Sequence, residues 1–275
     1  MPPKANKRSR KLASRQGKGK KVADPPLAIM SHQERMRASW MPKNCGLKNL
    51  GNTCYMNAGL QCLLHTTELS HFFLQGFYQQ DLNAVKALGC KAKLAQSFNL
   101  LVDQSHSHNH GGNGDLEQSV VNPYFMKRTI GEFNAVFKNY RQHDSQELLG
   151  SLLNGIHEDL NRMKDKPYVE NVVGDGKTDA ADAQDAWDGY KSRNDSFVVD
   201  TFQSQTRSRL RCLECENMSV SFDTSMYLSV AVPTDEPQPT ALDDMLRAYS
   251  EEERLTDSNQ WRSVHGGACG RRAHC

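Results

Sequence analysis

The sequence has few cysteines and no long apolar run. Its eight cysteines in 275 residues fall well below the ~8–10% of a disulfide-based scaffold. No segment approaches the ~18 consecutive apolar residues of a membrane span, and the first thirty residues lack the apolar stretch of a signal peptide. We therefore expect an intracellular protein, in the cytoplasm, the nucleus or both, without a membrane partner. Its reduced cysteines are candidates for a nucleophile or for metal ligands.

Acidic residues are absent before Asp24, whereas nine lysines and arginines lie between Lys4 and Lys21. Without these nine, the net charge of +2 becomes about −7, with 25 basic against 32 acidic residues. Nucleic-acid binding by the body is thus disfavoured, because it needs a basic face. The tail is poor in large apolar side chains, so we expect it to be disordered. It suits a nuclear-import signal, a weak nucleic-acid contact or a plain solvated tail.

The apolar spacing places helices before strands, which predicts an α+β fold. Spacings of three and four predict a helix from about Cys54, a second over 88–102 and a third over 144–163. Asp144 is the expected N-cap of the third helix, with Glu147 completing a capping box.

Turn and strand signals dominate the second half. Residues 164–194 are acidic with few apolar positions, which predicts a long loop. Strands are expected at 197–199, at 220–222 and over 227–232, followed by a last helix with Thr240 as its cap. His106, His108 and His110 stand among serine, asparagine and glycine, so we interpret them as a surface insertion in preference to a metal site.

Cys54 falls where a glycine turn leads into a helix. Unpaired N–H groups and the helix dipole stabilise an anion there, which favours the thiolate form of a cysteine. Asn49 and Asn52 offer side-chain N–H donors to an oxyanion near the sulfur. On local chemistry alone, a small buried cysteine beside a glycine turn is the favoured interpretation, and the reactive thiolate is the alternative.

Two longer motifs carry a family resemblance. The run from Gly46 to Leu63, which reads GLKNLGNTCYMNAGLQCL, closely resembles the cysteine box of ubiquitin-specific proteases. YRQHDSQELL, from Tyr140 to Leu149, resembles that family's Gln/Asp box, with Leu148 where many members have phenylalanine. The segments DLNR, KPYVE and RNDS, between 159 and 196, extend the similarity, which covers about 46–255.

The resemblance implies a papain-like cysteine protease hand, with a helical thumb and β fingers and palm that grip ubiquitin. Cys54 would be the nucleophile in hydrolysis of the bond after the terminal glycine of ubiquitin in ubiquitinated proteins. Asn49 matches the oxyanion donor, and Gln142 and Asp144 match positions beside the ubiquitin tail. Asp144 also has the plainer role of a helix cap. No cofactor is required for this chemistry.

Cys212 and Cys215 form a C-x-x-C pair, a spacing that lets two thiolates share one Zn²⁺. The family closes such a fingertip site with a second C-x-x-C, which is not found here. His265, Cys269, His274 and Cys275 are the remaining candidates. A structural zinc and a pair of reduced thiols at a hairpin both stay open.

The family's histidine base and its orienting residue have no match after Cys215, and His265 is a poor substitute. We therefore expect an incomplete catalytic domain over 45–255, between a basic tail over 1–44 and an atypical segment over 256–275. The expected function is a thiol-dependent deubiquitinase, with the chain alone inactive. The alternatives are a catalytically dead ubiquitin-binding fragment or pseudoenzyme, and a nuclear scaffold that acts through its tail.

Overall fold

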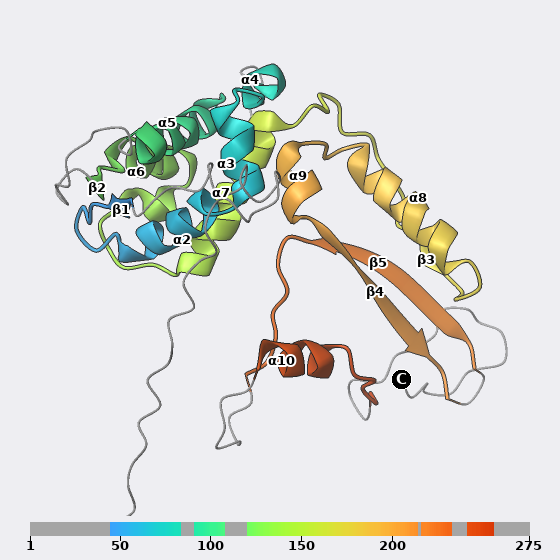
Figure 1. Cartoon of the computed structure of the whole chain (residues 1–275). Coiled ribbons are helices and arrows are strands. Elements are labelled where there is room, and N and C mark those ends of the chain that lie inside the picture. Colours follow the sequence, from blue (N-terminus) through green and yellow to red (C-terminus); the bar gives the residue numbers. More distant parts are fainter. Residues whose placement is uncertain (1–44, 84–90, 108–119, 214–215, 233–240, 256–275) are drawn as a thin grey trace, which may run out of the picture. The chain divides into compact units, whose positions relative to one another are not determined.

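The computed structural model describes residues 45–83, 91–107, 120–213, 216–232 and 241–255 (Figure 1). Most helices come first and an antiparallel sheet follows, so the predicted α+β class is confirmed. The helices are α2 (Cys54–Leu64), α3 (Thr67–Leu74), α4 (Tyr78–Asp81), α5 (Lys93–Ser107), α6 (Tyr124–Phe133), the 3₁₀ helix η2 (Ala135–Lys138), α7 (Ser145–Leu160), α8 (Asp179–Lys191), α9 (Phe197–Phe202) and α10 (Leu242–Tyr249). The strands are β1 (Gly46–Leu47), β2 (Val120–Val121), β3 (Val173–Gly174), β4 (Ser204–Arg211) and β5 (Met218–Ser225).

The hydrophobic core lies among helices α2, α3, α5, α6 and α7, which gather together in Figure 1. The predicted helices at Cys54, at 88–102 and at 144–163 correspond to α2, α5 and α7, although 84–90 lie outside the described residues. Each buries one apolar stripe, because residues three and four apart share a helix face. The stripes include Leu60 and Leu64 of α2, Phe98 of α5, and Leu152 and Ile156 of α7.

The DLNR segment at the end of α7 has a structural role. The buried Asp159 carboxylate accepts hydrogen bonds from the backbone N–H groups of Ala92, Leu94 and Ala95, at 2.9–3.2 Å. The carboxylate therefore accepts hydrogen bonds from the otherwise unpaired backbone N–H groups at the start of α5, where the helix dipole also favours a negative charge. Asn161 bonds the Arg193 carbonyl, at 3.1 Å, which joins the end of α7 to the chain beyond α8.

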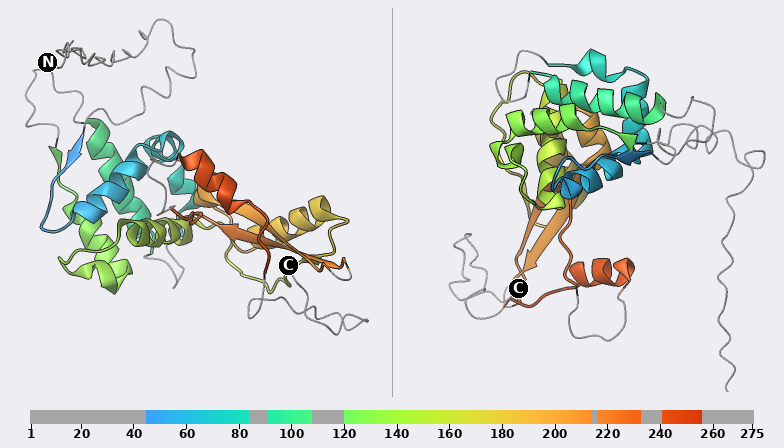
Figure 2. Two further views of the ribbon diagram at one scale, coloured as in Figure 1. Left: turned by 90° about the horizontal axis from the view of Figure 1, so that it is seen from below. Right: turned by 90° about the vertical axis from the view of Figure 1, so that its left-hand side faces the viewer.

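The sheet has the order β3-β5-β4 and is antiparallel throughout. β4 and β5 pair in register from Ser204 opposite Ser225 to Arg211 opposite Met218. Helix α8 packs against β3 and β5 and runs beside the strands in the left view of Figure 2. β1 and β2 form a separate parallel pair.

Two sequence predictions between 164 and 202 are wrong. Residues 164–194 are not a long loop, because they contain β3 and the 13-residue helix α8. None of the α8 residues is buried, so α8 lacks the buried apolar stripe from which a helix is usually predicted. Asp179 and Asp182 in its first turn stabilise the helix through their interaction with the helix dipole. Residues 197–199 form the start of α9 and not a strand. Ser196 caps α9 by accepting from Val199 N, and Val198 and Val199 are buried.

Three further predictions differ from the structure or fall outside it. Residues 227–232 lie outside any strand, and β4 was not predicted. The last helix is confirmed as α10, but its N-cap is Ala241 in place of Thr240. The histidine-rich stretch lies mainly outside the described residues, as do the flanking segments 1–44 and 256–275. Within the described ranges, none of the helices is long and apolar enough to cross a bilayer.

Candidate active site

Cys54 is the first residue of α2, and its thiol is exposed. Thr53 precedes it at the N-cap position, yet the Thr53 side chain makes no capping hydrogen bond to the helix. No acidic side chain stands in the first turn of α2. The first N–H groups of α2 therefore remain available to an anion at the sulfur, as the sequence predicts.

Asn49 organises the loop that precedes Cys54. Its side-chain oxygen accepts from Gly51 N at 3.0 Å, from Thr53 N at 3.2 Å and from the Thr53 hydroxyl at 3.1 Å. The loop turns through left-handed backbone at Gly51 and Asn52, with φ of 105° and 50°. All three bonds use the Asn49 oxygen, and the Asn49 Nδ2 group makes no hydrogen bond within the described part of the chain. It remains a free N–H donor beside Cys54.

The second sequence motif lies against this loop. Asn52 Nδ2 donates to the Tyr140 carbonyl at 3.1 Å, and the Ser145 hydroxyl donates to the Tyr55 carbonyl at 2.9 Å. The His143 ring meets the Tyr55 ring edge-on, with centroids 5.2 Å apart. The structure thus brings together two motifs that are about ninety residues apart. Asn52, expected as an oxyanion donor, uses one of its two side-chain N–H groups to tie the cysteine loop to the second motif.

Asp144 occupies the predicted cap of α7. Its Oδ1 accepts from Gln146 N at 2.7 Å and from Glu147 N at 2.9 Å. The expected return bond from the Glu147 side chain is not present among the described residues, so the capping box is only half formed. Asp144 and Gln142 are both exposed. Their placement leaves the second Asp144 oxygen open to solvent and to a basic ligand.

Burial shifts the pKa values of two side chains, Tyr55 and Lys127. Burial raises the pKa of the Tyr55 hydroxyl, and the neighbouring Cys54 adds to this shift. The pKa of the Lys127 ammonium is lowered by burial as well. Within the described residues, no imidazole contacts the Cys54 sulfur; His265 lies outside them.

The sequence reasoning missed Lys127. This side chain of α6 is 3% exposed and donates to the carbonyl oxygens of Phe137 and Asn139, below the second motif. Its only sequence signal is a lysine on the apolar side of an amphipathic helix, between Met126 and Ile130.

The predicted zinc ligands are only partly described. Cys212 follows β4 and is buried, whereas Cys215 and the candidates from His265 onward lie outside the described residues. The described residues contain no group of three potential metal ligands. Cys212 N donates to the Asn217 carbonyl at 2.9 Å, which closes the turn between β4 and β5.

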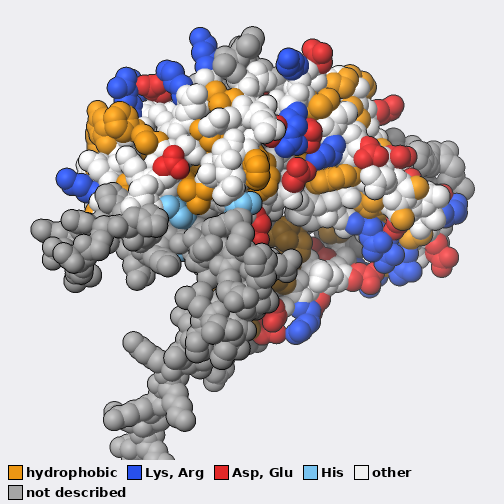
Figure 3. Space-filling model, turned by 45° about the horizontal axis from the view of Figure 1, so that its top comes forward, with side chains coloured by type: hydrophobic (Ala, Val, Ile, Leu, Met, Phe, Trp, Pro, Cys, Tyr) orange, Lys and Arg blue, Asp and Glu red, His pale blue; other side chains and the backbone are white. Residues whose placement is uncertain are grey.

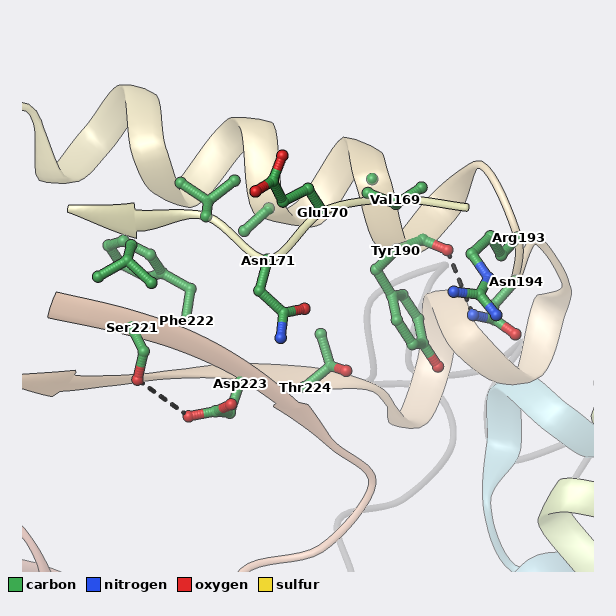
Figure 4. Close-up of a pocket in the computed structure, with 14 residues that line it drawn as sticks. Val169, Glu170, Asn171, Tyr190, Arg193, Asn194, Ser221, Phe222, Asp223 and Thr224 are labelled. Carbon is green, nitrogen blue, oxygen red and sulfur yellow. Dashed lines mark hydrogen bonds between the residues drawn. The ribbon is translucent and has the colours of Figure 1, made fainter. Parts of the chain in front are cut away.

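A cavity of about 310 Å³ lies between α8, β3 and β5 (Figure 4). Its lining includes Tyr190, Arg193 and Asn194 at one end and Ser221 and Asp223 along β5. None of the predicted site residues lines it. Cys54 therefore lies outside this cavity, at the exposed start of α2.

Comparison with known proteins shows the family to which the chain belongs. Residues 45–248 match the family described as "Ubiquitin carboxyl-terminal hydrolase". The chain is 42% identical over 201 residues to ubiquitin carboxyl-terminal hydrolase 4 of Bos taurus, and 44% identical over 189 residues to putative ubiquitin carboxyl-terminal hydrolase 11 of Arabidopsis thaliana. These alignments cover 73% and 69% of this chain but 20% of each relative. The chain thus matches about a fifth of the length of these relatives.

Solved structures support the fold. A chain of the SAGA Ubp8/Sgf11/Sus1/Sgf73 DUB module bound to ubiquitin aldehyde aligns with a TM-score of 0.55 at 18% identity, over 86% of this chain and 43% of that one. A SAGA DUB module bound to monoubiquitin gives a TM-score of 0.57, over 86% and 44% of the two chains. From the profile match, the relatives and the shared fold, we conclude that this chain belongs to the ubiquitin carboxyl-terminal hydrolase family.

Proposed function

We propose that this chain carries the nucleophile and the oxyanion donors of a thiol-dependent deubiquitinase. The observation that carries the proposal is the exposed Cys54 thiol at the uncapped start of α2, beside the free Asn49 N–H. The substrate would be an isopeptide or peptide bond after the C-terminal glycine of ubiquitin in a ubiquitinated protein. The structural neighbours described above are bound to ubiquitin aldehyde and to monoubiquitin, which fits this substrate class.

The reaction divides into two steps. The Cys54 thiolate attacks the glycine carbonyl, and the resulting oxyanion takes hydrogen bonds from Asn49 Nδ2 and from the backbone N–H of Cys54. Collapse breaks the C–N bond, the proton that the Cys54 thiol gave up is returned to the leaving amine through a base or water, and a thioester remains. Water then hydrolyses the thioester and restores the thiol. All groups named are protein groups or water, so no cofactor takes part.

Gln142 and Asp144 are proposed to bind the ubiquitin tail. The open oxygen of Asp144 is suited to a guanidinium, because carboxylate and arginine form short charge-assisted hydrogen bonds. Nucleic acid is a poor alternative ligand for the body. Figure 3 shows basic and acidic side chains side by side on the visible face, in keeping with the slightly acidic charge outside the N-terminal tail.

A ubiquitin probe with a C-terminal electrophile tests the proposal directly. The full chain is expected to form a covalent adduct at Cys54, and Cys54→Ala is expected to abolish it. Cys62→Ala is the matched control, because Cys62 is an exposed thiol on the same helix and its loss should change nothing. A folded chain that gives no adduct, or an adduct at Cys62, contradicts the proposal.

A second candidate is ubiquitin binding without turnover. It is favoured by the lack of an imidazole at the Cys54 sulfur among the described residues, since the thiol needs a base and the leaving amine needs a proton. A fluorogenic ubiquitin substrate separates the two candidates. Turnover by this chain that is lost in Cys54→Ala rules out the second, whereas probe labelling or ubiquitin binding without turnover supports it.

Zinc binding is also proposed, with Cys212 and Cys215 as two of the four ligands of a structural site and the other two drawn from His265, Cys269, His274 and Cys275. Its support is the C-x-x-C spacing and the position of Cys212 at the end of a hairpin strand. About one zinc per chain is expected in protein purified without chelator, with loss in Cys212→Ser. Metal analysis that finds no zinc in either protein contradicts this site.

Cytoplasmic and nuclear localisation is proposed from the basic segment between Lys4 and Lys21. Deletion of residues 1–24 is expected to reduce the nuclear share of a fluorescently labelled chain. An unchanged distribution contradicts an import signal in this segment.

A further inference from the structure

A buried lysine lies beneath the second motif of the site. Lys127 is only 3% exposed, and lysine is rarely buried to this extent without partners. Its ammonium donates to the carbonyl oxygens of Phe137 and of Asn139, the latter at 2.7 Å. It also lies 5.3 Å from the centroid of the Tyr140 ring. The ammonium thus lies at the C-terminal end of η2 and supplies hydrogen bonds to two backbone carbonyls there.

The residues held by Lys127 lead to the cysteine loop. Asn139 Oδ1 accepts from Arg141 N at 2.9 Å and bonds His143 Nε2 at 2.9 Å. The Tyr140 carbonyl accepts from Asn52 Nδ2 at 3.1 Å. Asn52 stands two positions before Cys54, in the left-handed backbone that turns the chain into α2. Two hydrogen bonds, joined by the covalent backbone from Asn139 to Tyr140, therefore connect the buried ammonium to the loop of Cys54.

We infer that Lys127 is a positioning residue for Cys54 and its oxyanion donors. The ammonium fixes the turn 137–140, the Tyr140 carbonyl fixes Asn52, and Asn52 fixes the loop in which Asn49 presents its free N–H. The inference that this alignment serves catalysis rests on the proposed function. The mechanical link from Lys127 to the loop is independent of ubiquitin and is tested separately.

Hydrogen–deuterium exchange of the full chain tests the mechanical link. Lys127→Met keeps the length of the side chain and removes its donors and charge, so exchange should accelerate in 139–143 and also in 50–54. Lys138→Met is the control, because Lys138 is exposed on the same turn and should leave both segments unchanged. Asn52→Gly tolerates the left-handed backbone but lacks the amide, so exchange should accelerate in 50–54 alone.

Reaction with the electrophilic ubiquitin probe tests the catalytic consequence. Lys127→Met should slow adduct formation roughly 10-fold or more, since small misplacements of reacting groups cost up to ~10²-fold. Alkylation of Cys54 by iodoacetamide needs no oxyanion donors and should stay within about twofold. The double variant with Asn52→Gly should be no slower than the slower single variant, because both act through one path.

The inference is overturned if Lys127→Met accelerates exchange in 139–143 but leaves 50–54 as in the wild type, or if Asn52→Gly leaves 50–54 unchanged. If Lys127→Met does not fold, Lys127→Arg takes its place, because the larger guanidinium displaces the carbonyls of the turn. A change confined to 139–143 in that variant again overturns the inference. A wild-type chain that gives no adduct contradicts the proposed function, while the exchange experiment still decides on Lys127.

Discussion

At the residue scale, Asn49 combines two roles in one amide. The oxygen holds the loop through Gly51 N and Thr53 N, and the nitrogen is the proposed oxyanion donor. In the proposed function, a single amide group would therefore couple loop geometry to the chemistry at Cys54. The two roles can be separated, because aspartate keeps an acceptor oxygen and replaces the N–H donor.

The first prediction concerns this separation. Asn49→Ala and Asn49→Asp should both slow adduct formation with the ubiquitin probe by about 10²–10³-fold, the usual cost of one lost oxyanion donor. Only Asn49→Ala should lower the free energy of unfolding, by roughly 1 kcal/mol, because it alone loses the loop acceptor. The measurements are single-turnover labelling and urea unfolding. Asn49→Asp with wild-type labelling would exclude the donor role.

The second prediction concerns Asp144, which caps α7 and is proposed to bind the ubiquitin tail. Asparagine is as good an N-cap as aspartate, so Asp144→Asn should keep the unfolding free energy within about 0.5 kcal/mol and weaken ubiquitin binding. Asp144→Ala should weaken binding equally and also destabilise by ~1 kcal/mol. Calorimetry and thermal unfolding provide both readouts. If Asp144→Asn binds ubiquitin like the wild type, Asp144 is only a helix cap.

The sequence anticipated this part of the site because its signals are local. A glycine turn before a helical pattern places Cys54, and an aspartate before an apolar stripe places Asp144. Lys127 could not be predicted in the same way, since its partners are backbone carbonyls ten and twelve residues along the chain. Every residue has a backbone carbonyl, so the sequence does not indicate which carbonyls a lysine on a helix will bind.

At the element scale, two glycines of α7 have opposite surroundings. A Cβ on Gly155 would stand 2.9 Å from Phe133 Cε1 and would also overlap Leu94, whereas a Cβ on Gly150 would meet nothing closer than 3.8 Å. Of these two positions, Gly155 is the one at which α7 is closely packed against its neighbours. Glycine at this position allows an approach that no other residue permits.

The third prediction uses this pair as its own control. Gly155→Ala should destabilise the chain by about 1–3 kcal/mol, because the added methyl overpacks the core. Gly150→Ala should stabilise it by ~0.5–1 kcal/mol, through higher helix propensity at an uncrowded site. Chemical unfolding of the two variants gives both values. Equal effects of the two substitutions would show that α7 and its neighbours are not packed as described.

The strand prediction for residues 197–199 is wrong because it relies on local propensity. Phe197, Val198 and Val199 favour a strand by type, but burial of the two valines and the Ser196 cap select a helix. The ring of Phe197 stacks on Phe72, with centroids 4.1 Å apart, which holds α9 against α3. Such tertiary contacts override propensity and have no signature in a sequence window.

At the scale of the whole chain, Arg162 joins segments far apart in sequence. Its guanidinium pairs with Asp81 at 2.7 Å and with Asp195 at 3.3 Å. Lys191 adds a second contact to Asp195, at 2.9 Å. The end of α7 is thereby linked both to α4 and to the segment between α8 and α9. Hydrogen bonds and charge from Asp81 and Asp195 raise the pKa of Arg162, so this cation is permanent.

The fourth prediction follows from the pKa of Asp195. Burial acts to raise this pKa, but the hydrogen bond and charge of Lys191, together with Arg162, outweigh it, so the folded-state pKa is below the ordinary value. A carboxyl with a depressed pKa stabilises the fold above its unfolded pKa of ~3.9, and this contribution is lost as pH falls through the folded-state value. The melting temperature should therefore decline below about pH 4.

Asp195→Asn isolates this contribution. The variant should melt at a lower temperature than the wild type at pH 7, and the difference should shrink below about pH 4, where the wild-type carboxylate becomes protonated. Asp165→Asn is the control, because Asp165 is exposed and takes part in none of the ion pairs among the described residues. A difference that persists undiminished to pH 2 would mean that Asp195 acts through its shape and hydrogen bonds, and that its charge does not link α7 to the segment before α9.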